Sequence, residues 1–358
     1  MVESIWTSAA VGINGPVPIG LALVRAVDAI LLASAPVGVG LCAVVLSPGL
    51  DGKAARAALS ARLPQVPVLV LQAEGPLGGG ERVRHGAAVL IGQWPGDPAV
   101  LRRLPSVRAL PTGPGPGWLF AEACSPALEL ALARTRGRVW GATAEGLLEP
   151  MGSPAAVWLE LPPSFSMELR FALGALPIGR RLRAGGVSDG QIGMLDGVPA
   201  ARALSSLGAE LARADRERLR LRPLLLRADG PAWAVGGLGR PMRVLGVHES
   251  SSHLLLQGEV RAGASVQLGA AQTPALSAGW ARRPLDTAGL RLGLLVHGAA
   301  GPAPEGLPDA ELAAVLATLG PSPLFGFTAE RQLFGREGRS AAFFGSTLLG
   351  AMYEPPFD

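Results

Sequence analysis

The sequence contains little lysine, tyrosine or charge. Of its 32 basic residues only Lys53 is lysine, and it has 9 Phe and 1 Tyr. The net charge of +4 comes from arginines that are spread along the chain with acids among them. Proteins that bind single strands combine a basic groove with aromatic side chains on which bases stack. The composition therefore argues against a nucleic-acid partner.

The N-terminus also lacks the charged region of a secretory signal, since Glu3 precedes the first arginine, Arg25. The uncharged run 29–50 has the length of a membrane span, but two prolines and two glycines interrupt it. We interpret it as a helix end, a loop and a buried strand. The only cysteines, Cys42 and Cys124, lie in apolar runs and are typical of buried thiols in a reducing compartment. We expect a cytoplasmic chain with no membrane partner.

What is abundant is apolar side chain and glycine. Hydrophobic residues make up 49% and charged residues 17% of the chain, beside 49 Gly and 32 Pro. This balance is typical of a globular protein with many tight turns rather than of a disordered chain. At 358 residues, two packed domains or two halves of one architecture are expected.

One pattern occurs three times: apolar residues, then Thr or Gln, then Ala-Glu, two further residues and Leu. The three segments are 69–77, 140–148 and 325–333. Each follows a short apolar run and a stretch of helical character, and the helices are predicted at 53–63, 126–134 and 309–319. A strand, a helix and a second strand in succession predict a crossover unit with two parallel strands. Further strands are predicted at 87–91, 155–159 and 341–349.

The Ala-Glu turns follow the strand ends at which open α/β sheets bind ligands. Carboxylates and hydroxyls suit a ligand with an amine or several hydroxyl groups, and an arginine could meet a carboxylate. We predict a pocket where the repeats join, with the ligand-binding residues Glu74, Thr143, Glu145, Thr328, Glu330, Arg331 and Thr347. The alternative is that each Ala-Glu is only a turn, with its carboxylate in a surface ion pair.

The section between the second and third segments has a different pattern. Short apolar runs end at Gly or Asp-Gly turns, which predict antiparallel strands. The predicted strands include 244–249, 252–259 and 264–268, and a helix is predicted at 199–222.

Three motifs resemble sites of chemistry. The segment 186–190 has the spacing Gly-x-Ser-x-Gly, but its flanks predict a turn between strands, which disfavours Ser188 as a nucleophile. His248 and His253 are five residues apart in a strand pattern, which does not fit zinc. His297, at the end of a predicted strand, is a weak candidate for a metal ligand or for the axial ligand of haem. We predict no catalytic residue.

The order of these segments is similar to that of the FIST family of bacterial sensory proteins. The resemblance is carried by Ala175–Gly179, by the run Gln191–Leu204, and by the tail from Gly326 to Thr347. Two positions depart from the family pattern. Ala329 precedes Glu330 where the family tends to have Gly-Glu, and Phe344 stands where the family tends to have the His of His-Gly-x-Thr. Any role of that imidazole is in doubt in this chain.

The resemblance implies a non-enzymatic domain that binds a small ligand and signals through a separate protein. We expect an α/β fold with mixed sheets and α+β character, in two related halves at 1–165 and 166–358 that contain the strand-helix-strand repeats. No cofactor is expected. The alternatives that stay open are a haem-based gas sensor, a small hydrolase or transferase, and a degenerate scaffold that binds a partner protein.

Overall fold

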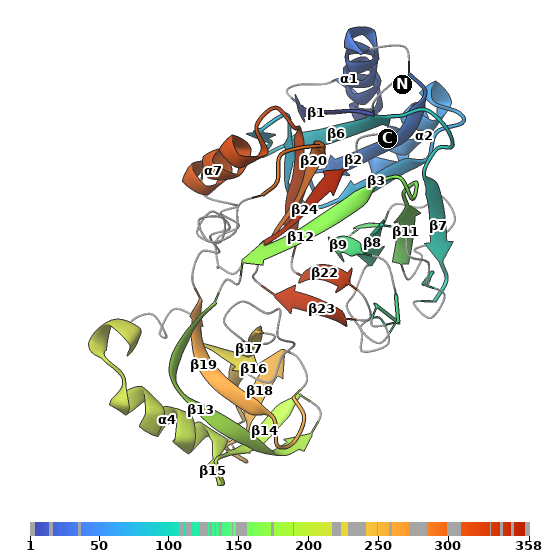
Figure 1. Ribbon diagram of the computed structural model, residues 1–358. Helices are drawn as coiled ribbons and strands as arrows, with labels where there is room; N and C mark the ends of the chain where they lie inside the picture. Colours follow the sequence, from blue (N-terminus) through green and yellow to red (C-terminus); the bar gives the residue numbers. More distant parts are fainter. Residues whose placement is uncertain are drawn as a thin grey trace.

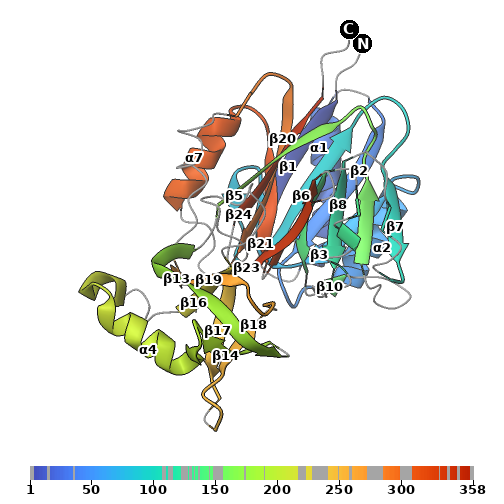
Figure 2. The same ribbon diagram turned by 60° about the horizontal axis from the view of Figure 1, so that its bottom comes forward.

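The computed structural model describes residues 4–13, 17–34, 37–106, 110–111, 116–121, 128, 131–132, 134–135, 138–144, 146–147, 156–172, 175–188, 190–216, 223–227, 241–248, 250–257, 260–271, 285–298, 309–329, 331–336, 339–344 and 347–354. They form an α/β structure with four β-sheets, which confirms the predicted fold class at this level. Three sheets lie together in one lobe and the fourth forms a second lobe with α4 (Figures 1 and 2). No helix in the described ranges is long and apolar enough to cross a membrane.

Sheet A is built around two parallel strands, and its helices cover one face. Asp51 starts the crossover helix because its side chain accepts a hydrogen bond from the Ala54 N–H. Leucines, valines and isoleucines of both helices pack against the strands. The strand order is β1 (Ile5–Gly12), β6 (Gly86–Gln93), β2 (Val39–Leu46), β3 (Val68–Gln72) and β10 (Gly146–Leu147), and the helices are α1 (Ile19–Ala33) and α2 (Gly52–Arg62).

Sheet C has the same type of centre. Its order is β7 (Val100–Leu104), β11 (Ala156–Glu160), β8 (Gly117–Ala121), β9 (Val139–Thr143), β22 (Arg331–Arg336) and β23 (Arg339–Phe344). Strands β8 and β9 are parallel, and Leu128 and Leu132 from the segment between them are buried against the sheet.

Sheet B completes the first lobe. Its order is β12 (Ser166–Ala172), β24 (Thr347–Tyr353), β20 (Leu290–Gly298), β21 (Leu324–Ala329), β4 (Glu74–Gly78) and β5 (Glu81–Arg82). Strands β20 and β21 are parallel, and the helix between them is α7 (Asp309–Leu319), which covers one face of the sheet with Leu312, Val315 and Leu319.

The three sheets share one order of pairing. Each has an edge strand, a return strand and two parallel strands that the segment between them connects. The parallel pairs also have one register, because the first residue pairs are Cys42 with Val68, Gly117 with Val139, and Gly293 with Leu324. The predicted parallel strand pairs are confirmed. That the segments are copies of one repeat, and that the chain has two related halves, stay predictions.

The strand after each Ala-Glu pair leaves its own sheet. The chain passes from β3 of sheet A to β4 of sheet B, from β21 of sheet B to β22 of sheet C, and from β9 of sheet C to β10 of sheet A. Ala73, Ala144 and Ala329, which precede these crossings, all lie in one hydrophobic core between the three sheets. The exchange therefore surrounds a single core with contributions from the whole lobe.

Sheet D is antiparallel and closed. Its long strand β13 pairs with β19 along its first part and with β14 along its last part, so that the two ends of the sheet meet. The order is β13 (Ala175–Ser188), β19 (Ser265–Ala271), β16 (Pro223–Arg227), β17 (Pro241–Val247), β18 (Leu254–Gln257), β14 (Gln191–Leu195) and β15 (Val198–Pro199). Leucines, valines and alanines fill a separate core, to which α4 (Ala200–Glu210) adds Leu207.

Two predicted elements have wrong bounds. The helix predicted at 199–222 ends at Glu210, because Leu211 adopts extended backbone with ψ 149° and packs beside Gly179. Residues 217–222 lie outside the described ranges. The strand predicted at 341–349 is two strands, β23 and β24, which belong to sheets C and B respectively.

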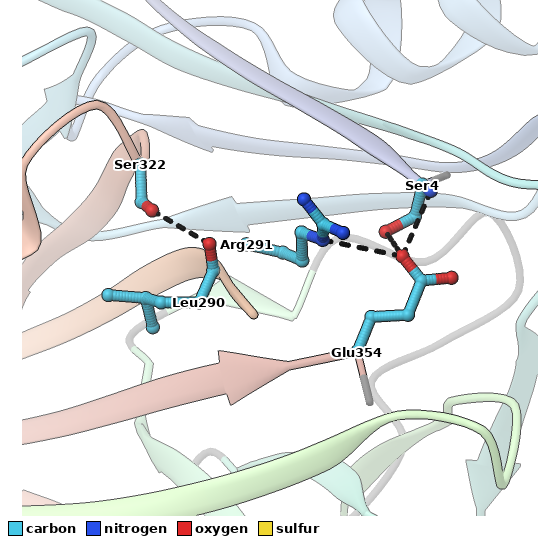
Figure 3. Close-up of polar contacts among 5 residues, drawn as sticks. All are labelled: Ser4, Leu290, Arg291, Ser322 and Glu354. Carbon is cyan, nitrogen blue, oxygen red and sulfur yellow. Dashed lines mark hydrogen bonds and ion pairs between the residues drawn. The ribbon is translucent and has the colours of Figure 1, made fainter. Parts of the chain in front are cut away.

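The start of β1 and the end of β24 are joined by buried polar groups. The N–H and the hydroxyl of Ser4 both donate to Glu354 Oε2, at 2.9 and 2.5 Å (Figure 3). Arg291 Nε lies 3.5 Å from the same oxygen, and the Ser322 hydroxyl donates to the Leu290 carbonyl at 2.9 Å. These contacts fix the edge strand of sheet A to sheet B at the amino end of β20.

Candidate functional site

Four polar residues lie side by side at one end of sheet B. His297 on β20 pairs in register with Thr347 on β24 and with Thr328 on β21. Thr328 in turn pairs with Glu74 on β4, the strand that comes from the first Ala-Glu segment. We call Thr347, His297, Thr328 and Glu74 the polar row. It brings together three of the predicted ligand-binding residues and the weak metal candidate.

The polar row lies at the carboxyl ends of two parallel strands. His297 and Thr328 are each the last residue but one of their strand. Neighbouring side chains of a strand point to opposite faces, and Val296 belongs to the core between the sheets while Leu295 packs against α7. His297 therefore faces the side that α7 covers. This is the edge of an α/β sheet at which ligands bind.

The imidazole of His297 is buried and neutral. Its exposed fraction is 6%, that of Thr347 is 0%, and His297 Nδ1 lies 2.8 Å from Thr347 Oγ1. Burial, and secondly the positive charge of Arg82, lower the pKa of His297 from 6.5 to about 4. The ring therefore acts at neutral pH as an uncharged hydrogen-bonding group.

The hydrogen bond with Thr347 selects the tautomer of this ring. Among the described residues Nδ1 is the only partner of the Thr347 hydroxyl, which is fully buried and therefore needs an acceptor for its proton. The hydroxyl donates to Nδ1, and the proton of the neutral ring is then on Nε2. Within the described ranges Nε2–H has no hydrogen-bond partner. The row thus presents an unpaired donor.

The hairpin of β4 and β5 brings two charged groups to the polar row. Glu74 is exposed at its outer end. A Cβ placed on Gly75 would lie 3.2 Å from Thr328 Oγ1 and 3.8 Å from Arg82 Cδ, so the threonine hydroxyl and the arginine stem lie on the same side of Gly75. With φ +52° Gly75 is also in the left-handed region, which glycine adopts at little cost.

The remaining predicted residues are not in this row. Thr143 ends β9 in sheet C, and Arg331 begins β22, where the register that pairs Gln332 with Ala142 continues toward Thr143. Glu145 and Glu330 lie outside the described ranges. The prediction that the three glutamates converge on one pocket is therefore untested, although the alanines before them share a core.

Sequence reasoning missed Arg82 and Gly75. Neither belongs to the repeated pattern, and their place beside Thr328 follows from the pairing of β4 with β21, which joins distant parts of the chain. His297 was considered only as a metal or haem ligand. Its position one residue before the end of an apolar strand was the available signal.

The other two sheets provide an internal comparison for the polar row. In sheet A the residues that correspond in register to Thr347, His297 and Thr328 are Ala87, Leu46 and Gln72. In sheet C they are Ala156, Ala121 and Thr143. The same place in the same strand order is thus built twice with apolar residues at the first two positions. The fold does not require a buried His and Thr there.

The other motifs singled out in the sequence form no catalytic or metal centre. Ser188 pairs with Gln191 across the hairpin of β13 and β14, which confirms the predicted turn between strands and does not form the strand-turn-helix of a nucleophile. His248 and His253 close the hairpin of β17 and β18, where the His248 N–H donates to the His253 carbonyl at 2.8 Å. No group of three or more metal-binding side chains occurs in the described part of the chain.

A haem does not fit the donor set of the polar row. An axial histidine binds iron through a ring nitrogen with a free lone pair. In His297 the lone pair of Nδ1 accepts from Thr347, and Nε2 has the proton. We derive no haem chemistry from this site. No family model matches the chain, and a search of curated proteins finds no match.

Proposed function

We propose that the chain is a non-enzymatic sensory protein of the cytoplasm that binds a small ligand at the polar row. The observation that carries this proposal is the comparison of the three sheets. A buried hydroxyl and imidazole gain little net stability from one hydrogen bond, and apolar residues fill the same positions in sheets A and C. Buried polarity that the fold does not need is characteristic of a functional site.

The ligand chemistry follows from the exposed side of the row. The Glu74 carboxylate accepts hydrogen bonds, and the Thr328 hydroxyl beside it both donates and accepts. These groups suit a ligand with an amine or several hydroxyl groups. The similarity of the segment order to the FIST family supports the same conclusion, and a signal would be passed to a separate protein. We further propose that the three strand-helix-strand units are copies of one repeat, supported by their common pairing order.

The proposal is tested by giving sheet B the residues of sheet A. The double variant His297→Leu/Thr347→Ala reproduces Leu46 and Ala87. Replacing both partners of a buried hydrogen bond with apolar groups is nearly neutral or stabilising, so we expect a free energy of unfolding in urea equal to or above that of the wild type at pH 7. We also expect ligand binding to be lost.

The matched control makes the reverse exchange in sheet A. Leu46→His/Ala87→Thr places the polar pair where both native residues are 0% exposed. We expect this variant to lose about 3 kcal/mol or more, as is usual when polar groups enter an apolar core. If instead the sheet B variant loses several kcal/mol, the polar pair is a structural element and the proposed function is wrong.

A further inference from the structure

His297 holds a donor that the protein itself does not use. The imidazole is 6% exposed, its Nδ1 is occupied by Thr347, and its Nε2–H has no partner among the described residues. A buried donor without an acceptor costs free energy, so a side chain held in this way indicates that the acceptor comes from elsewhere. The polarity of that acceptor is opposite to the groups that Glu74 would bind.

The surroundings of Nε2 are positive. Thr347 binds the edge of the ring that faces β24, so the opposite edge, with Cδ2 and Nε2, faces β21 and the hairpin. Arg82 lies on that hairpin, its stem beside Gly75 and the Thr328 hydroxyl, and its charge acts on the imidazole. Thr328 is 8% exposed and offers a second short donor.

We infer that His297 Nε2–H, the Thr328 hydroxyl and the Arg82 guanidinium form a subsite for an oxyanion, the carboxylate or phosphate group of the bound ligand. This inference rests on the proposed function, since it names the group by which the ligand is held. The neutral ring donates one hydrogen bond, and the guanidinium supplies the charge. Glu74, at the outer end of the row, then selects ligands whose oxyanion is accompanied by a donor group.

The chain has 4 His, which makes the imidazoles easy to resolve by NMR with ¹⁵N-labelled histidine. At pH 7 we expect His297 to have the proton on Nε2. We then titrate with propionate, with inorganic phosphate, and with propionamide as a neutral analogue, at constant ionic strength. A saturable shift of the His297 Nε2 resonance with propionate or phosphate, and none with propionamide, supports the subsite. The responding anion identifies the group.

Two variants separate a specific site from general charge. Arg82→Gln is expected to weaken anion binding roughly tenfold and to leave the tautomer unchanged. Arg84→Gln removes the same charge from an exposed position two residues away and should have no effect.

The inference is overturned if His297 has its proton on Nδ1, if neither anion produces a saturable shift, or if Arg82→Gln and Arg84→Gln act alike. These results leave the proposed function standing when a neutral ligand still depends on the polar row. The proposed function itself fails on the stability of the sheet B double variant, which the anion titration does not measure.

Discussion

Single residues differ most where the three sheets are otherwise alike. Position for position, His297 corresponds to Leu46 and Ala121, and Thr347 corresponds to Ala87 and Ala156. The apolar residues gain stability from burial alone, whereas His297 is held neutral against its ordinary titration. The function of sheet B is therefore expressed in side chains rather than in its backbone.

The pKa of His297 makes the stability of the protein depend on pH. It falls from 6.5 to about 4 on folding, so the unfolded chain binds the proton more tightly. The contribution is fully present above about pH 6.5 and is lost as the pH falls toward 4, for a total of roughly 3 kcal/mol. Urea unfolding of the wild type should show this slope between pH 6.5 and 4.5, and His297→Leu/Thr347→Ala should show a flatter one. Parallel curves for the two proteins would contradict the buried neutral imidazole.

Single strands show what the sequence could and could not predict. The repeated pattern locates β3, β9 and β21 and the helix α7, because apolar period and helix-start residues are local signals. Nothing local indicates that Glu74–Gly78 pairs with β21 rather than with its own sheet. The split of 341–349 into β23 and β24 was missed for the same reason, since the two strands are apolar but belong to different sheets.

Strand β21 is also pinched beside the site. An added Cβ at Gly326 would lie 2.1 Å from the Leu295 carbonyl oxygen, whereas sheet A has Val70 at the corresponding position. Gly326→Ala must displace backbone two residues from Thr328, and we expect a loss of about 2 kcal/mol or more in urea unfolding. Gly208→Ala, in helix α4 with open space around it, should instead gain up to about 1 kcal/mol. Equal effects of the two variants would show that the close approach is relaxed in solution.

At the scale of the molecule, the exchange of strands joins distant parts of the chain into one site. Glu74 and Arg82 come from the first part of the chain, and His297, Thr328 and Thr347 from the last. The predicted list contained Glu74, Thr328 and Thr347 because each belongs to a recognisable segment. Their adjacency depends on the packing of three sheets around one core, which no local pattern encodes. A ligand in the polar row would connect these sheets.

The central claim, that the polar row holds a small ligand, is tested most directly by native mass spectrometry of the protein purified from its own cells. We predict that the wild type has an additional small mass at one copy per chain. The variant His297→Leu/Thr347→Ala, purified in the same way, should have the mass of the polypeptide alone while remaining folded. A bound mass retained equally by both proteins would place the ligand elsewhere and contradict the account.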